Sequence, residues 1–512
     1  MIKRSSFIFL LTGFLWASVQ KAACQDTLLT VNYKGKLDSL QSTALKQTRM
    51  FQVFVPPGYK PGNADKYDVL YVLDGGNWNI SLVTQLQRFI QNEGHMPPSI
   101  IVSIMGIDRN IELTPTVLKS WNATTGGGAQ FLAYIKNELI PYINEHYPSN
   151  GDNTLWGHSL GGMFATYVML QEPGLFKSYI AADPSLWWDD CLVQKMAVEK
   201  LQALHAPVTY FISGRTGTTF HEMKIDSMEA VLKAHAPANL KWKIQYYAGE
   251  THSSIRLKTI YDGLMYTYEG MTNAMDFYPA NGIVLKDKPY QIIYSEDTTR
   301  IHYTLDGSLP TAQSPQAPKI ITVTGPATLT YARLGNRSRY DRSIGGTFTI
   351  ETLPPPLSKP GAKKPGGFAY TYYEGEGAER PNLKSATAIK AGMMDKDFNA
   401  STLPRKNSYC LVLEGLLEVK DDGYHCFFAR AGKGSMLWLA GKPIMHWSDN
   451  EKKDVFSYQL PLSKGFYPVR IESYDKKEDF NLLLYYLTPS MSLSGDAMPV
   501  PLEVEYGVNK SK

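Results

Sequence analysis

The feature that most constrains this 512-residue chain is the segment Gly-His-Ser-Leu-Gly at residues 157–161. A short strand-like run precedes it, and a helix-forming run, 163–170, follows it. A Gly-x-Ser-x-Gly segment in this setting is typical of a sharp strand-to-helix turn, because glycines let the chain pass close to the serine. The N-terminus of the following helix then points at any negative charge that develops there. We therefore interpret Ser159 as a nucleophile; the simpler alternative is that Ser159 only caps the helix.

Length and patterning set the domain organisation. A chain of 512 residues is expected to form about two to four domains. Residues 27–275 alternate between strand and helix patterns, with apolar strands at 67–73, 99–105, 178–182 and 208–213, which predicts an α/β domain. From about residue 277 the pattern becomes all-β. The net charge of +4, with acids and bases interleaved, gives no reason to expect nucleic acid as a partner.

The first 24 residues have the pattern of a secretory signal: basic residues at 3 and 4, an apolar run over 7–19, and small residues before Gln25. Export to the periplasm or the extracellular space is therefore expected. Cys24 raises the alternative of a lipoprotein anchor, but Lys21 does not suit a lipobox, so cleavage after Cys24 is preferred. The apolar run is too short to span a membrane, and no later segment is long enough.

Two loops complete the expected acyl-transfer site. His252 follows the strand expected at 241–247, in a loop downstream of the serine, which is where the base of an α/β-hydrolase lies. A free imidazole titrates near pH 6.5, so His252 suits a general base, and its simpler interpretation is an exposed loop histidine. The turn at 74–77 follows an early buried strand, and the backbone N–H groups of Gly76 and Leu160 are the expected oxyanion hole. His158 is expected to pack beside the turn.

Residues 30–275 resemble the esterase family of α/β-hydrolases that includes enterochelin esterases, esterase D and feruloyl or acetyl-xylan esterases. The segments that carry the resemblance are 55–59, 70–75, 109–115, 157–162, 183–188 and 249–252. The resemblance implies a Ser–His hydrolase of carboxylic esters that needs no cofactor or metal. It also implies substrate contacts for Arg109, Trp187 and Trp188, although burial of the two tryptophans in the core is an equal alternative.

The acid of the triad departs from the family pattern. It should follow the strand at 208–213, but residues 214–219 contain no carboxylate. Glu222 is the preferred candidate, and Asp226 lies slightly later. Asp183, after the preceding strand, is a less usual alternative, and a Ser–His dyad is another.

The remaining chain resembles two accessory modules. Residues 280–350 resemble the small immunoglobulin-like domain at the C-terminus of chitobiase-type glycosidases, and 368–508 resemble a PA14 β-sandwich. Residues 351–367 are rich in proline and glycine, so we expect a linker without helix or strand. Asp421 and Asp422 are expected in a hairpin turn, and Cys410 and Cys426, which flank this hairpin, are candidates for a disulfide.

These features together predict an exported serine esterase followed by two β domains. Modules of carbohydrate-active enzymes favour a feruloyl or acetyl ester on a polysaccharide, by analogy alone. The alternatives are a siderophore trilactone esterase of the enterochelin type and a non-catalytic polysaccharide-binding protein. The partner is accordingly a polysaccharide or a small-molecule ester.

Overall fold

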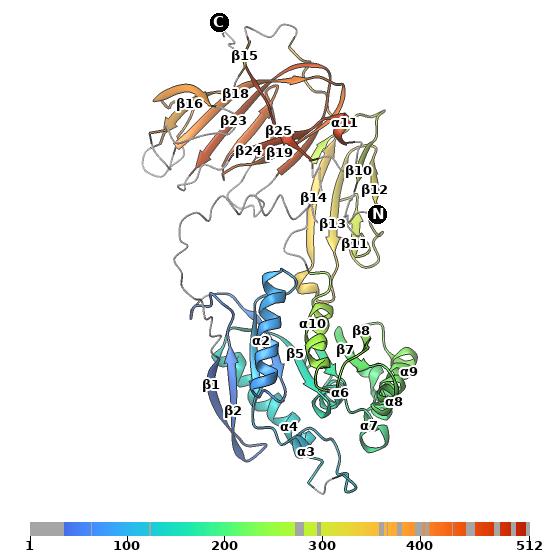
Figure 1. The fold of residues 1–512 in the computed structure, drawn as a ribbon. Helices are drawn as coiled ribbons and strands as arrows, with labels where there is room; N and C mark the ends of the chain where they lie inside the picture. Colours follow the sequence, from blue (N-terminus) through green and yellow to red (C-terminus); the bar gives the residue numbers. More distant parts are fainter. Residues whose placement is uncertain are drawn as a thin grey trace. The chain divides into compact units, whose positions relative to one another are not determined.

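The computed structural model describes residues 35–62, 64–121, 124–271, 281–293, 298–357, 363–365, 367–375, 381–394, 403–404, 409–432, 434–446, 456–475, 482–492 and 498–507. The chain divides into two compact units, Met1–Phe89 with Pro97–Gly263 and Ile90–Met96 with Leu264–Lys512 (Figure 1). The expected secretory signal, 1–24, lies outside the described residues, and export therefore stays a prediction. Within the described residues, no helix is long and apolar enough to cross a membrane.

The first unit is built on an eight-stranded sheet in the order β1-β2-β4-β3-β5-β6-β7-β8. Its strands are β1 (Lys36–Ser42), β2 (Gln47–Phe54), β3 (Tyr67–Val72), β4 (Ser99–Ile104), β5 (Ser149–His158), β6 (Ser178–Ala182), β7 (Val208–Arg215) and β8 (Leu240–Tyr247). The pairs β1·β2 and β2·β4 are antiparallel, and all the others are parallel. Helices cover the inner strands, so β4 and β6 are buried along their whole length and have mainly apolar sequences.

Helices connect these strands and flank the sheet (Figure 1). They are α2 (Asn77–Asn92), α3 (Arg109–Glu112), α4 (Gly128–Tyr134), α5 (Ile140–His146), α6 (Leu160–Gln171), α7 (Trp188–Lys200), α8 (Thr218–Glu222), α9 (Ile225–His235) and α10 (Ile255–Thr267). A π-helical turn, η1 (Ile135–Leu139), joins α4 to α5, and a 3-10 turn, η2 (Leu201–Ala203), follows α7. The α/β class predicted for the N-terminal half is confirmed.

The second unit is rich in strands, as the sequence predicts. They are β9 (Asn281–Ile283), β10 (Tyr290–Ile293), β11 (Ile301–Thr304), β12 (Ile320–Val323), β13 (Ala327–Arg333), β14 (Arg342–Thr349), β15 (Lys363–Pro365), β16 (Phe368–Glu374), β17 (Lys390–Met394), β18 (Tyr409–Val419), β19 (Gly423–Arg430), β20 (Met436–Leu439), β21 (Lys442–His446), β22 (Phe456–Leu462), β23 (Gly465–Asp475), β24 (Leu483–Leu487), β25 (Val500–Pro501) and β26 (Glu505–Gly507). Two short helical turns, η3 (Ser338–Tyr340) and α11 (Pro489–Ser492), complete it.

One sheet contains strands from both of the expected β regions. Its order is β11-β13-β14-β9-β22-β19-β24-β25, and β9 pairs in parallel with β14 on one side and β22 on the other. Each region still has its own apolar core, one that includes Leu329 and Phe348 and another that includes Leu413 and Leu460. The division into 280–350 and 368–508, and the immunoglobulin-like and PA14-like identities, stay predictions.

Three expectations for this unit are wrong. Strand β15, inside the expected linker, pairs with β26 at the edge of a sheet, a position that tolerates the proline at 365. Strands β18 and β19 belong to different sheets, so Asp421 and Asp422 connect two sheets and do not form a hairpin turn. Cys426 on β19 is a buried free thiol, which excludes the disulfide to Cys410 on β18.

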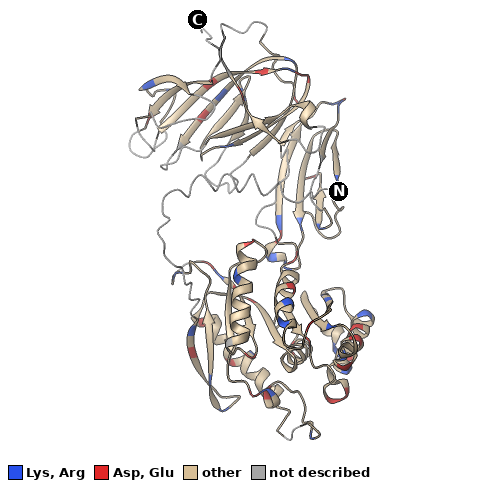
Figure 2. Cartoon of the chain, viewed as in Figure 1, with Lys and Arg blue, Asp and Glu red and all other residues tan. Residues whose placement is uncertain are grey.

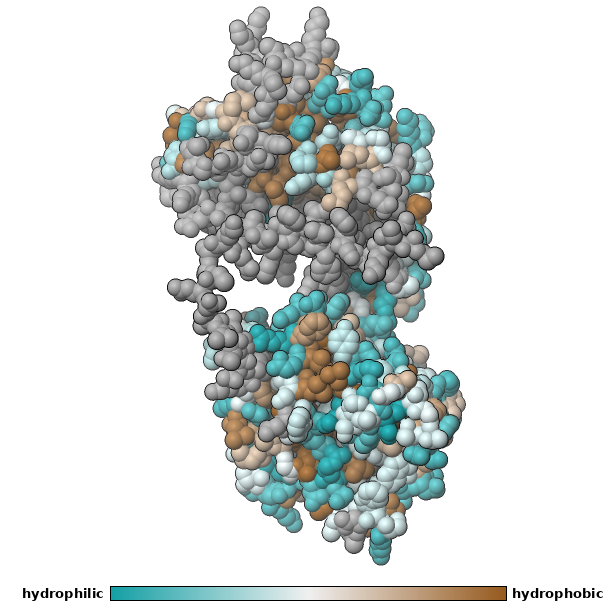
Figure 3. All heavy atoms as spheres, viewed as in Figure 1, coloured by the Kyte–Doolittle hydropathy of each residue, from teal (hydrophilic) through white to brown (hydrophobic). Residues whose placement is uncertain are grey.

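Acidic and basic residues are interleaved along the chain in both units (Figure 2). In the space-filling view of Figure 3, hydrophobic atoms on the visible face of the first unit form small groups separated by hydrophilic ones.

Candidate active site

Ser159 lies in a strained turn between β5 and α6. Its backbone has φ 61° and ψ −117°, outside the regions that residues with a side chain favour. A Cβ atom at Gly157 would lie 2.2 Å from the carbonyl oxygen of Gly161, so glycine is required where the chain folds back on itself. Strain of this kind costs about 1–3 kcal/mol and is concentrated at functional sites. The turn therefore has the geometry expected of a nucleophile elbow.

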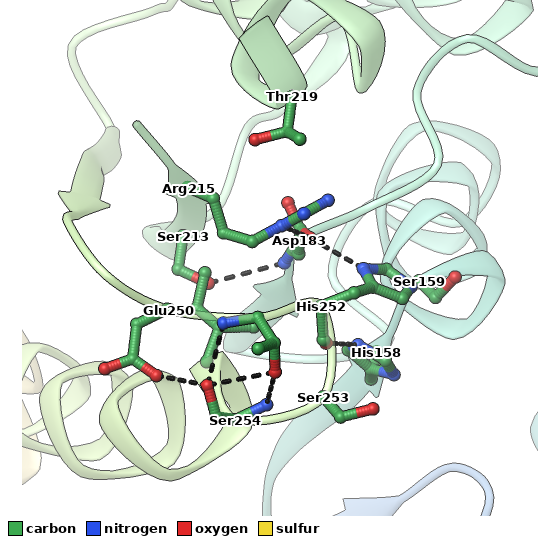
Figure 4. Close-up of polar contacts among 12 residues, drawn as sticks. His158, Ser159, Asp183, Ser213, Arg215, Thr219, Glu250, His252, Ser253 and Ser254 are labelled. Atoms are coloured by element: carbon green, nitrogen blue, oxygen red, sulfur yellow. Dashed lines mark hydrogen bonds and ion pairs between the residues drawn. The ribbon is translucent and has the colours of Figure 1, made fainter. Parts of the chain in front are cut away.

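His252 lies beside this turn, in the loop between β8 and α10. Its Nδ1 is 2.6 Å from Oδ2 of Asp183. A carboxylate accepts, so Nδ1 carries the proton and Nε2 keeps its lone pair. In the view of Figure 4, Ser159 lies on the side of the imidazole opposite Asp183. Thr251 and Ser254 exchange hydrogen bonds that close the loop around the histidine. The arrangement suits a general base held by a buried acid.

Asp183 follows β6 and is fully buried, and two donors share one of its oxygens. Oδ2 accepts from Nδ1 of His252 and from Nε of Arg215, each at 2.6 Å (Figure 4). Arg215 ends β7, the strand adjacent to β6, so sheet pairing brings the two residues together. Oδ1 of Asp183 is buried and has no hydrogen-bond partner among the described residues. The buried carboxylate is thus stabilised by a cation while it orients the histidine.

Glu222, the preferred sequence candidate for the acid, is not the partner of His252. Glu222 is exposed and is the last residue of α8, the helix that follows the end of β7. Asp226 accepts from Nδ1 of His221 at 2.6 Å and is likewise engaged elsewhere. The prediction is wrong because the strand-end position expected to hold an acid is occupied by Arg215, and the carboxylate comes from the neighbouring strand. Asp183 was the less usual alternative in the sequence.

His158 contacts the backbone of the loop that carries His252. Its Nε2 donates to the backbone carbonyl of His252 at 2.6 Å, and the two rings lie 4.4 Å apart. Burial, with a smaller effect of the neighbouring His252, lowers the pKa of His158 to about 3. His158 is therefore neutral near pH 7 and acts as a hydrogen-bond donor. Its sequence interpretation, packing beside the turn, did not include this contact.

The two expected oxyanion donors differ in this structure. Leu160 is the first residue of α6, so its N–H has no acceptor within the helix. The N–H of Gly76 instead donates to the carbonyl of Asp74 at 2.7 Å. Arg109 pairs with the carboxylate of Asp74 and also donates to the carbonyl of His158 at 3.4 Å. Leu160 thus suits the role, whereas Gly76 would first have to leave Asp74.

The segment that follows Asp183 brings a second hydroxyl and the two tryptophans to the elbow. Oγ of Ser185 lies 3.2 Å from Oγ of Ser159, a contact that the sequence patterns did not single out. Trp187 is half-buried, but Trp188 is fully buried and donates from Nε1 to Thr116 at 3.1 Å. The expectation that Trp188 contacts substrate is therefore wrong, and its alternative, burial in the core, holds.

Comparison with known proteins agrees with this geometry. Residues 42–256 match a family model described as "Putative esterase". Ferri-bacillibactin esterase BesA of Bacillus subtilis (strain 168) is 27% identical over 173 residues, which are 29% of this chain and 58% of that protein. Siderophore enterobactin esterase of Emericella nidulans is 38% identical over 147 residues, which are 24% of this chain and 48% of that protein.

A solved structure described as an IroE-like serine hydrolase from Shewanella oneidensis is 30% identical, with a TM-score of 0.43, and the match covers 48% of this chain and 83% of that one. This chain spans about half the length of the curated relatives it matches. Residues 42–256 are thus similar to an esterase family, and the family match and the names of these relatives support a carboxylic ester hydrolase.

Proposed function

We propose that the protein is an exported serine esterase that works through an acyl-enzyme. The observation that carries the proposal is the contact of 2.6 Å between Asp183 and His252, in the loop beside the strained Ser159. It leaves the lone pair on Nε2 of His252, which is the nitrogen a serine hydrolase uses as its base. Export rests on the sequence of residues 1–24 alone.

The reaction follows from these roles. His252 accepts the proton of the Ser159 hydroxyl as its oxygen attacks the ester carbonyl. The resulting oxyanion is stabilised by the Leu160 N–H at the start of α6, and Asp183 stabilises the imidazolium. His252 then passes the proton to the leaving alcohol. Water, deprotonated by His252, attacks the acyl-enzyme; the bond from the acyl carbon to the Ser159 oxygen breaks, His252 returns the proton to that oxygen, and the carboxylic acid is released.

Two substrate classes have support. The relatives named above are siderophore esterases, which supports a siderophore ester of the enterochelin type. The strand-rich second unit, with its predicted PA14-like module, supports a feruloyl or acetyl ester on a polysaccharide. We place the siderophore ester first, because its support comes from the segment that holds the site. The non-catalytic alternative rested on the missing acid, and the contact between Asp183 and His252 argues against it.

The test compares three substrates with one enzyme preparation. Purified protein is incubated with a catecholate trilactone, feruloylated arabinoxylan and acetylated xylan, and the released acids are measured by chromatography. We expect release from at least one, and Ser159→Ala should lower kcat by about 10³- to 10⁶-fold. Release from the trilactone alone would assign the siderophore class, and release from a polymer alone the polysaccharide class. Equal turnover by Ser159→Ala would reject the mechanism.

A further inference from the structure

Three tryptophans form one cluster in the first unit. The ring centroid of Trp121 lies 5.3 Å from that of Trp187 and 6.3 Å from that of Trp188. The centroids of Trp187 and Trp188 are 5.8 Å apart. Trp188 is 0% exposed, Trp187 is half-buried and Trp121 is 55% exposed, so the cluster runs from the core to the surface. The exposed indole of Trp121 therefore offers a face on which another aromatic ring can stack.

The segment that carries Trp187 also contacts the nucleophile. Ser185, whose hydroxyl is 3.2 Å from that of Ser159, precedes Trp187 by two residues in the same turn. The turn is closed by a hydrogen bond of 3.3 Å from the Trp188 N–H to the Ser185 carbonyl. The Trp121 indole nitrogen in turn donates to Asn110 at 3.4 Å, next to Arg109, which contacts the residue before Ser159. Trp121 is thus linked to the elbow indirectly, through Trp187 and through Asn110.

The segments that contact Trp188 are hydrogen-bonded and strained. The Thr116 hydroxyl accepts from Nε1 of Trp188 at 3.1 Å and donates to Asp189 at 2.7 Å. Immediately after Trp188, three consecutive residues without glycine, 189–191, have left-handed backbone angles, with φ of 45°, 51° and 61°. Consecutive strained residues persist only where the surroundings hold them, and they are concentrated at ligand sites. Holding these indoles in place therefore costs the fold some stability.

We propose that Trp121 and Trp187 form an aromatic shelf that binds an aromatic ring of the ester substrate. The proposal rests on the proposed function and narrows it to aryl-bearing esters, such as hydroxycinnamoyl or catechol-bearing ones. An acetyl ester of a sugar presents no aromatic ring to this surface. Stacking on an indole favours flat aromatic rings over alkyl chains of similar size.

The test measures selectivity with matched methyl esters. Methyl ferulate and methyl butyrate share a leaving group and differ in the acyl ring. Trp121→Ala and Trp187→Ala should each lower the ratio of kcat/KM for ferulate over butyrate by about tenfold. Trp121→Phe should restore most of the ratio because it keeps a ring. Phe89→Ala is the matched control. Phe89 is 53% exposed, like Trp121, but it lies near the C-terminal end of α2, twelve residues after Asn77, the residue at which that helix begins.

A second readout does not depend on turnover. Calorimetric binding of methyl ferulate to Ser159→Ala should weaken about tenfold when Trp121→Ala is added. If the wild-type protein hydrolyses both esters and neither tryptophan variant changes the ratio by more than twofold, the shelf is rejected while the esterase stands. If the wild-type protein hydrolyses neither methyl ester and none of the three substrates of the proposed function, the esterase fails, and loss of ferulate binding on Trp121→Ala still supports the shelf. Unchanged binding rejects it.

Discussion

Replacing Asp183 tests the site most directly, because two donors share its Oδ2. Asp183→Ala removes the acceptor, so His252 loses both its orientation and the stabilisation of its cation. Loss of the acid lowers kcat by about 10⁴-fold in a Ser–His–Asp triad, or about 5 kcal/mol. We expect a loss of that order here, measured as kcat on p-nitrophenyl acetate.

Asp183→Asn should cost less than Asp183→Ala. Since His252 and Arg215 both donate to Oδ2, the amide oxygen is expected to take that place, and the amide nitrogen the unpartnered site of Oδ1. The histidine then keeps its proton on Nδ1, and only the charge is lost. A hydrogen bond to a charged group exceeds a neutral one by about 1–2 kcal/mol, so we expect a loss of about 5- to 30-fold.

The matched control is Glu222→Gln, an exposed carboxylate that the sequence favoured. It should change kcat by less than twofold, with folding of all variants checked by circular dichroism. The reasoning is refuted if Glu222→Gln loses more activity than Asp183→Ala. It is also refuted if Asp183→Ala loses less than tenfold, in which case a Ser–His dyad is the better account.

Three further predictions follow from the same contacts. Arg215→Gln should lower the free energy of unfolding by about 3 kcal/mol because it leaves Asp183 charged and buried, and Arg215→Lys should recover part of it in denaturant titration. The pKa of His158 falls to about 3 on folding, so its contribution to stability is complete above pH 6.5 and is lost as the pH falls towards 3. His158→Gln should therefore flatten the pH dependence of unfolding over that range, and an unchanged slope would contradict the assignment. Gly157→Ala should abolish folding or lower the melting temperature sharply, since its Cβ would meet the carbonyl oxygen of Gly161 at 2.2 Å; a wild-type melting temperature would show that the elbow relaxes.

Local patterns in the sequence determined the elbow, the α/β alternation and the loop of His252. Each depends on residues close together in the chain: two glycines that admit a backbone approach, apolar runs that cross a covered sheet, and a histidine directly after a strand. The β-rich character of the C-terminal half could be predicted for the same reason, since the alternation of apolar and polar residues and the turn residues act over a few positions.

The tertiary structure decided which groups meet. Asp183 and His252 are far apart in the chain. The pairing of β6 with β7 places Asp183 next to Arg215, and the same carboxylate contacts His252. Strand pairing between distant segments also assigned β18 and β19 to different sheets, which separated Cys410 from Cys426. Contacts of this kind depend on the order of strands in a sheet, and local propensity carries no information about that order.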